Sequence, residues 1–199
     1  MQLFEIDKLQ YIDLSDNNLN KLGAQIGKKL RDEITHIKWI DLTQNDFFHD
    51  TQALSMIIQG LKKQVALNYV GLSVSGLYCD QIVRLLQPRR PPLSLNLRNS
   101  TLNDKSVEYL AKAISNSDNN LSALSLKYCY LTFEHVHQLA KALRFNRSLV
   151  KLDLSHNALK FSTTKYLLES CIDNVTLVTL DLSGNFLDDQ FAEKFAEVL

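Results

Sequence analysis

The chain has 199 residues, 45% of them apolar, and its 22 acidic side chains balance its 22 basic ones. Because the formal net charge is zero, no overall field attracts nucleic acid or an anionic membrane surface, and both partner classes are disfavoured. No apolar run approaches the length of a membrane span, so a spanning segment is not predicted.

The first eight residues, MQLFEIDK, place Glu5 and Asp7 where a signal peptide would need its apolar core. We interpret residues 1–8 as a minimal N-terminal cap. An odd number of cysteines, in separate parts of the chain, does not favour a disulfide framework and suits a reducing compartment; they are Cys79, Cys129 and Cys171. A cytoplasmic location is the expectation, with a secreted effector that acts in a host cytosol as the alternative.

An eleven-residue pattern then recurs seven times, with starts near residues 9, 37, 67, 92, 121, 149 and 177. Four copies are nearly identical: LQYIDLSDNNL (9–19), IKWIDLTQNDF (37–47), LVKLDLSHNAL (149–159) and LVTLDLSGNFL (177–187). Their apolar fourth and sixth positions alternate with polar ones, which predicts a short strand with one buried face. At position nine stands an asparagine whose amide is expected to bond the backbone of the turn after the strand; these are Asn17, Asn45, Asn157 and Asn185.

The three middle copies are weaker: LNYVGLSVSGL (67–77), PLSLNLRNSTL (92–102) and LSALSLKYCYL (121–131). Ser75, Ser100 and Cys129 replace the asparagine. We expect Cys129 to be a small buried group and the two serines to weaken the turn contacts locally. Before the fourth copy, the shortened connection LLQPRRPPLSL packs three prolines around Arg89 and Arg90. It either presents the arginines to a partner or is a tolerated irregularity.

The segments between the copies carry apolar residues at helical spacing. Helices are predicted over residues 52–61, 78–87, 104–116, 132–146 and 162–172, with Asp104 and Thr132 as expected N-caps. Each unit is therefore strand, turn, helix and turn. No single unit can bury its apolar face without neighbours, so the units are expected to stack.

This arrangement resembles the leucine-rich repeat family, and specifically the ribonuclease-inhibitor-like subclass with repeats of about 28 or 29 residues. The resemblance covers residues 9–199. It implies an α/β fold, a right-handed solenoid (the leucine-rich repeat horseshoe) with a parallel concave β-sheet and outer α-helices. About seven repeats would form a single domain over residues 1–199. The resemblance also implies a role in binding proteins.

No catalytic or metal-binding motif is recognisable among the histidines, cysteines and acidic residues. His135 and His137 are two residues apart on a predicted helix, so their side chains diverge, and we interpret them as part of a solvated outer face. Glycine-rich phosphate loops are absent from the sequence as well. The chain is therefore predicted to be non-enzymatic, with neither a metal nor a cofactor.

The outward-facing positions of the predicted strands supply candidate binding residues. Position three holds the neighbouring aromatics Tyr11, Trp39 and Tyr69, and such residues are enriched in interface hot spots. Acidic residues at position five flank them, so a ligand with basic and apolar groups would complement this face. Alternatively, the aromatics stabilise the sheet by cross-strand packing and the acidic groups bond neighbouring backbone.

A second cluster combines basic and aromatic residues at positions seven and eight of units four to six: Arg98, Lys127, Tyr128 and His156. Its alternative interpretation is a solvated strand edge. The complete set of candidate partner-binding residues is Tyr11, Asp13, Trp39, Asp41, Tyr69, Arg98, Lys127, Tyr128, Lys151, Asp153 and His156.

The C-terminal segment carries an apolar stripe of Phe191, Phe195 and Leu199 at helical spacing. A longer native chain is the favoured explanation. End-to-end association through these three residues and a partner that docks there are the alternatives.

Three functions remain open at this stage. The favoured one is a non-enzymatic protein-protein interaction module that binds a protein partner on its concave face. The others are a scaffold or structural subunit of a larger assembly, and the targeting or recognition region of a larger protein, such as a bacterial effector delivered into a host cell.

Overall fold

The computed structural model describes residues 8–47, 50–78, 81–82, 85, 93–116 and 118–198. Within these ranges seven strands form one parallel sheet in chain order. The strands are β1 (Tyr11–Asp13), β2 (Trp39–Asp41), β3 (Tyr69–Gly71), β4 (Leu93–Asn96), β5 (Leu121–Ser125), β6 (Lys151–Asp153) and β7 (Thr179–Asp181). Each lies within the first five residues of one of the eleven-residue cores of the sequence pattern.

Helices follow the strands. They are α1 (Gly23–Asp32), α2 (Thr51–Lys63), α4 (Asp104–Ser115), α5 (Phe133–Phe145), α6 (Phe161–Asp173) and α7 (Asp189–Val198), and two short 3₁₀ helices are η1 (Asn20–Leu22) and η2 (Gly76–Tyr78). The helix expected over residues 78–87 lies mostly outside the described residues, as do Cys79, Arg89, Arg90 and the three prolines. Within the described ranges, no helix combines the length and apolarity that crossing a membrane requires.

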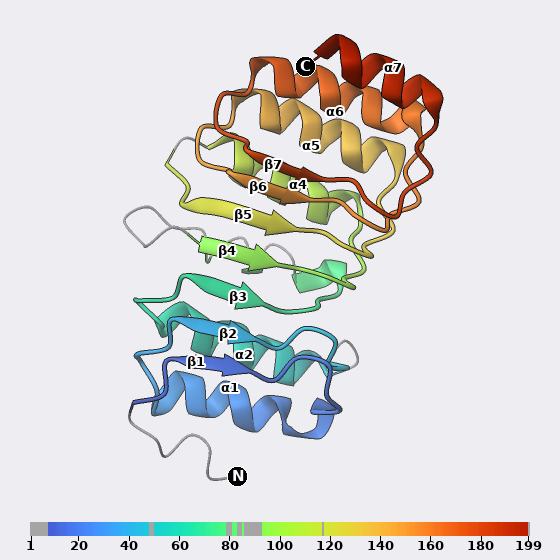
Figure 1. The fold of residues 1–199 in the computed structure, drawn as a ribbon. Helices are drawn as coiled ribbons and strands as arrows, with labels where there is room; N and C mark the ends of the chain where they lie inside the picture. The colour runs from blue at the N-terminus through green and yellow to red at the C-terminus, as the bar shows by residue number, and fades with distance from the viewer. Residues whose placement is uncertain are drawn as a thin grey trace.

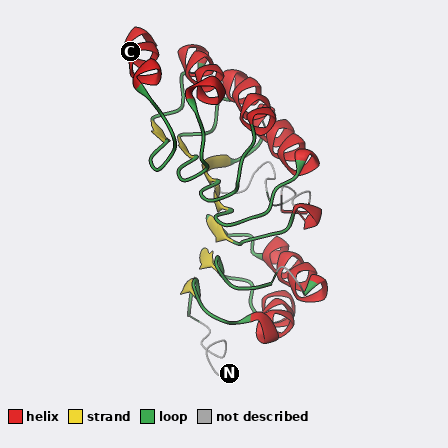
Figure 2. Ribbon diagram, turned by 90° about the vertical axis from the view of Figure 1, so that its right-hand side faces the viewer, coloured by secondary structure: helices red, strands yellow, loops and turns green. Residues whose placement is uncertain are grey.

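The units stack into a curved solenoid, with the strands on its inner side and the helices on its outer side (Figure 1). The view in Figure 2 shows the strands following the concave edge of the crescent. Neighbouring strands pair in register, for example Tyr11 with Trp39 and Trp39 with Tyr69. A register shift in the β4–β5 pairing lies between Leu93 and Ser94, directly after the shortened connection that precedes the fourth copy. Equivalent repeat positions therefore form rows across the concave face.

The core lies between the sheet and the helices. Positions four and six point into it as predicted; Ile40 and Leu42, for example, have no exposed surface. Leu180 and Leu182 of the last unit are only partly buried, because no further unit packs on them among the described residues. Burial of each apolar face thus depends on the neighbouring unit.

A side-chain ladder at position nine joins the turns of successive units. The Asn157 amide donates to Leu154 O in its own turn (3.0 Å) and to Leu126 O in the preceding unit (2.9 Å). Its Oδ1 accepts the Cys129 and Leu131 amides of that preceding unit. The predicted contact with its own turn is confirmed, and the bonds to the preceding unit extend it. Asn45 and Asn185 repeat the arrangement.

The middle units carry a reduced version of this ladder. Cys129 is 1% exposed and its Sγ lies 3.2 Å from Leu97 O, which confirms the small buried group. Ser100 accepts the Val74 amide at 2.9 Å through its hydroxyl. Because a serine hydroxyl forms fewer hydrogen bonds than an asparagine amide, fewer side-chain hydrogen bonds join successive turns here, as expected.

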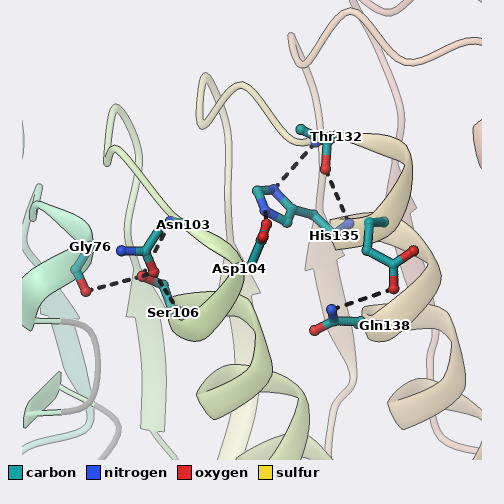
Figure 3. Close-up of polar contacts among 8 residues, drawn as sticks. Gly76, Asn103, Asp104, Ser106, Thr132, His135 and Gln138 are labelled. Carbon is teal, nitrogen blue, oxygen red and sulfur yellow. Dashed lines mark hydrogen bonds and ion pairs between the residues drawn. The ribbon is translucent and has the colours of Figure 1, made fainter.

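The helix starts differ from two sequence expectations (Figure 3). The N-cap of α4 is Asn103, which accepts the Ser106 amide, and not Asp104. Thr132 caps α5 as predicted, but His135 is 3% exposed, so its assignment to a solvated face was wrong. The Thr132 amide donates to His135 Nδ1, and Nε2 lies 2.9 Å from Asp104 Oδ1. Because Asp104 is not the cap, its carboxylate is free to bind the next unit.

The ladder generates a stability prediction. Asn157→Ala leaves two buried amides and several carbonyls without partners, so we expect the free energy of unfolding to fall by about 2–4 kcal/mol. Asn17 occupies the same repeat position but is exposed and bonds only carbonyls of its own turn. Asn17→Ala should therefore cost less than about 1 kcal/mol. Urea unfolding followed by circular dichroism compares the two, and equal losses would contradict the ladder's role.

Candidate functional site

The concave face follows the predicted alternation at position three and only in part at position five. Tyr11 is 61% exposed, and Asp13 and Lys151 are exposed as well, but Asp41 is buried, contrary to the prediction. Continued alternation along the strand would place position seven on the same solvent-facing side, but Thr43 and Ser73 at this position are buried. The chain turns at this point, and the Thr43 hydroxyl donates back to Asp41 Oδ1 at 2.6 Å.

The three predicted aromatics lie on neighbouring strands with different roles. The Trp39 and Tyr69 rings stack with centroids 4.5 Å apart and planes 13° apart. Tyr69 donates its hydroxyl to Asp41 Oδ2 at 2.5 Å and accepts from Asn96 Nδ2 at 3.0 Å. Burial is the largest cause that raises the pKa of the Tyr69 phenol, and the hydrogen bond to Asp41 raises it further. Tyr69 is therefore held by its own sheet, whereas Tyr11 offers the most free ring surface.

The position-five carboxylates share one structural role. Each of Asp13, Asp41, Asp153 and Asp181 accepts the amide of the residue two positions later, at 2.8–2.9 Å. Hydrogen bonds from Ser15 lower the pKa of the Asp13 carboxyl, and Ser183 does the same for Asp181. Asp41 is only 7% exposed. These acidic groups therefore close the turns of their own units, whether or not they also meet a partner.

A hollow lies over the centre of the sheet, between β3 and β7. Its volume is about 340 Å³, and it is lined by twelve residues that include Tyr69, Ala123, Ser125, Lys151 and Asp153. Small side chains at positions three and five of units four and five leave this space between the larger groups on either side. Sequence reasoning missed the hollow, although the drop in side-chain size along these two rows was its signal.

The second predicted cluster comes together in the turns after β4, β5 and β6. The Tyr128 and His156 rings stack with centroids 4.5 Å apart and planes 24° apart. Arg98 Cζ lies 5.9 Å from the Tyr128 ring centroid, and Lys127 Nζ lies 5.5 Å from it. We call these four residues the basic rim. That the rim binds a partner stays a prediction.

The backbone beneath the rim takes a conformation that bulky residues seldom adopt. Tyr128 and His156 both have φ of 55°, and their repeat equivalents Asp16, Gln44 and Asn99 have φ of 54–58°. This left-handed conformation costs roughly 1–2 kcal/mol for most residues and least for Gly, Asn and Asp. Gly184 occupies the next equivalent position, where any Cβ would lie 2.4 Å from His156 Nδ1. Turn stability alone therefore does not account for aromatic rings in units five and six.

The remaining reactive groups have structural surroundings. Burial raises the pKa of the Cys129 thiol to about 12 and also raises that of Cys171, so both stay protonated near neutral pH. His137 is half-buried on the outer helix α5, and its ring centroid lies 4.9 Å from that of Tyr166. In the described part of the chain, no group of three or more His, Cys, Asp or Glu side chains is arranged to hold a metal ion.

The last repeat carries an apolar groove of about 500 Å³ between α6, β7 and α7. The Phe191 and Phe195 rings, stacked at 5.8 Å, line it together with Leu168, Leu177 and Val178. Leu199, the third member of the predicted stripe, lies outside the described residues. Val178 is 82% exposed, so this end of the solenoid presents apolar surface.

Known protein families match both ends of the chain. A family model described as Leucine Rich repeat matches residues 145–160 and 173–196, and one described as Leucine Rich Repeat matches residues 8–29. The ribonuclease inhibitor of Mus musculus is 36% identical over 87 residues, which are 44% of this chain and 19% of that protein.

Longer proteins match as well. The NACHT, LRR and PYD domains-containing protein 13 of Homo sapiens is 35% identical over 89 residues, 45% of this chain and 8% of that protein. Protein 4C of the same series in Mus musculus is 26% identical over 159 residues, 80% of this chain and 13% of that protein. The chain thus spans less than a fifth of the length of each of these curated relatives.

A solved structure, the actin-binding site 2 of leiomodin-1, aligns with a TM-score of 0.52 at 17% identity. The alignment covers 78% of this chain and 91% of that one. At this identity the likeness concerns the fold alone, and it agrees with a solenoid of parallel strands and outer helices.

The environment of Tyr69 generates a pH prediction. Because folding raises the phenol pKa, the unfolded chain loses this proton first, and wild-type stability should fall as pH rises above about 10. Tyr69→Phe removes the hydrogen bonds, so it should lower the free energy of unfolding by about 1–2 kcal/mol at neutral pH. Because the variant has no phenol to ionise at this position, its stability should fall less at alkaline pH. The difference in free energy of unfolding between wild type and variant should therefore narrow above about pH 10.

Urea unfolding at neutral and alkaline pH measures this gap. Tyr11→Phe is the control at neutral pH, because it removes an exposed hydroxyl and should change stability by less than about 0.5 kcal/mol. A gap for Tyr69→Phe that stays constant through the alkaline range would contradict the assignment.

Proposed function

Because this chain belongs to the leucine-rich repeat family, with ribonuclease-inhibitor-like repeats, we propose that it is a non-enzymatic protein-protein interaction module whose concave face binds a protein partner. The observation that carries the proposal is the hollow of about 340 Å³ over the centre of the sheet. Tyr69 of the Trp39–Tyr69 stack and Lys151 are among its lining residues, and Tyr11 is exposed on the far side of that stack.

The shape and the residues of this face suit a protein surface. Seven parallel strands present an extended inner surface, and curved solenoids use such surfaces to bind large partners. The hollow would receive a protruding side chain, while exposed aromatic rings supply contact area at low entropic cost. Candidate contacts are therefore Tyr11, Trp39 and Lys151, and the half-buried Tyr69 forms one wall.

The similar proteins support a protein as the class of partner, but they do not identify which protein it is. Leucine-rich repeat proteins in general bind other proteins, and one relative is named for inhibiting an enzyme, ribonuclease. A cytoplasmic location is part of the proposal, because Cys129 and Cys171 are free thiols that suit a reducing compartment. That these repeats serve as the recognition region of a longer protein, including an effector, also stays a proposal.

Affinity capture from cell lysate tests the binding face. Tyr11→Ala combined with Trp39→Ala removes two concave aromatics but keeps the Tyr69 hydrogen bonds, and we expect captured proteins to fall by about tenfold or more. The matched control removes three exposed apolar groups from the outer helices, Tyr109→Ala, Phe145→Ala and Ile172→Ala. Circular dichroism verifies that all variants fold alike. Loss of capture in the control variant, with retention in the concave variant, would overturn the proposal.

A second candidate function is a structural subunit, favoured by the apolar groove of the last repeat. Association through Phe191, Phe195 and the neighbouring Val178 would cover this exposed surface. This candidate predicts a mass above the 22.7 kDa of one chain in sedimentation experiments, and a return to that mass in Val178→Lys. Val65→Lys, which changes an equally apolar exposed site elsewhere, is the control. A single-chain mass at every concentration would contradict this candidate.

A further inference from the structure

We propose that the basic rim is a docking site for an acidic segment of a protein partner, in which Arg98 and Lys127 pair with carboxylates and the Tyr128–His156 rings pack against an adjacent apolar residue. This inference rests on the proposed function, because it assigns the chemistry of the partner that the concave face would bind. It concerns the edge of that face where strands β4 to β6 turn toward their helices.

Two cations converge on one ring there without a counter-ion. Arg98 and Lys127 both lie within 6 Å of the Tyr128 ring centroid. In the part of the chain that the structure describes, the ion pairs involve other basic residues and include neither of these two. Arg98 Nε is buried and has no hydrogen-bond partner. Neither cation is therefore committed to an ion pair with a described carboxylate.

Among the described residues, the nearest carboxylates stand on the strands and form no ion pair with the rim. Hydrogen bonds from Ser183 lower the pKa of the Asp181 carboxyl most, and the charges of Lys127 and His156 lower it further. Asp153 accepts the Ser155 amide at 2.9 Å through Oδ1 and the Ser125 hydroxyl at 2.8 Å through Oδ2. Asp181 accepts the Ser183 amide at 2.9 Å. These carboxylates sit at position five, on the strands, whereas the cations sit at position seven, in the turns.

Charge is distributed unevenly along the turns, which directs an acidic partner to one half of the solenoid. Positions seven and eight of units one to three contain no basic residue: Ser15, Asp16, Thr43, Gln44, Ser73 and Val74. The same positions in units four and five supply Arg98 and Lys127. An extended acidic segment would therefore gain its electrostatic attraction only at units four to six.

Exposed aromatic residues also occur at position ten of the repeat. Tyr130 of unit five, two residues after Tyr128, is 82% exposed, and Phe186 of unit seven is 67% exposed. Tyr130 is also in the left-handed conformation, with φ of 52°. Cations beside exposed rings fit a segment that alternates acidic and apolar residues, since arginine and tyrosine are among the residues most enriched in binding hot spots.

Selection from a phage-displayed library of random peptides on the immobilised chain tests the proposal. The expected result is a set of peptides rich in Asp and Glu with an apolar neighbour. Their affinity should fall by about tenfold or more in the double variant Arg98→Gln, Lys127→Gln, and also fall in Tyr128→Asn. Asn suits the left-handed turn, so this last variant should fold as well as the wild type. Lys105→Gln with Lys141→Gln removes two cations from the outer helices and should bind normally.

Each other outcome overturns the proposal. These outcomes are recovery of no peptides, recovery of peptides without acidic residues, or equal binding to the double variant. Inorganic phosphate is added as a competitor; if phosphate alone displaces the peptides completely at low concentration, the rim is a small-anion site and not a docking site. A partner that depends on Tyr11 and Trp39 but not on Arg98 and Lys127 would leave the proposed function standing and refute this inference.

Discussion

Hydrogen bonds from one side chain to the backbone of two successive turns hold this structure together. Asn157 binds carbonyls in its own turn and in the preceding one, and it accepts two amides of that preceding turn. Buried backbone groups in irregular turns need such partners, because strands three to five residues long satisfy few of them. This ladder fixes the turns of the units that carry the asparagine, and the backbone pairing of neighbouring strands sets the register of the sheet and the rows on its concave face.

The same constraint limits which concave residues remain free for recognition. The position-five carboxylates and several position-seven hydroxyls are engaged in their own turns, and Tyr69 binds both Asp41 and Asn96. What the turns do not use is the exposed ring of Tyr11, the ammonium of Lys151, the hollow between β3 and β7, and the basic rim. A partner would therefore meet aromatic and cationic groups rather than the conspicuous aspartates.

The repeat period, the strands and the buried rows could all be predicted from sequence, since alternation and a recurrent Asn157-type residue depend only on local spacing. The N-cap residue of α4 could not be predicted, because Asn103 and Asp104 are both favourable N-cap residues. Only the tertiary contact of Asp104 with His135 distinguishes their roles. Burial of Thr43 and Ser73 also escaped, because it depends on where the chain leaves the strand direction. The hollow arises from relative side-chain sizes on neighbouring units, which no single repeat reveals.

Hydroxyl-radical footprinting of the chain, alone and in complex with a protein that it captures, tests the binding face most directly. The experiment measures the oxidation rates of aromatic side chains on the concave face and on the outer helices at the same time. The account predicts that oxidation of Tyr11 and Tyr128 slows in the complex, while Tyr109 and Phe145 on the outer helices react as before. Protection of Tyr109 and Phe145, with Tyr11 and Tyr128 unchanged, would contradict it.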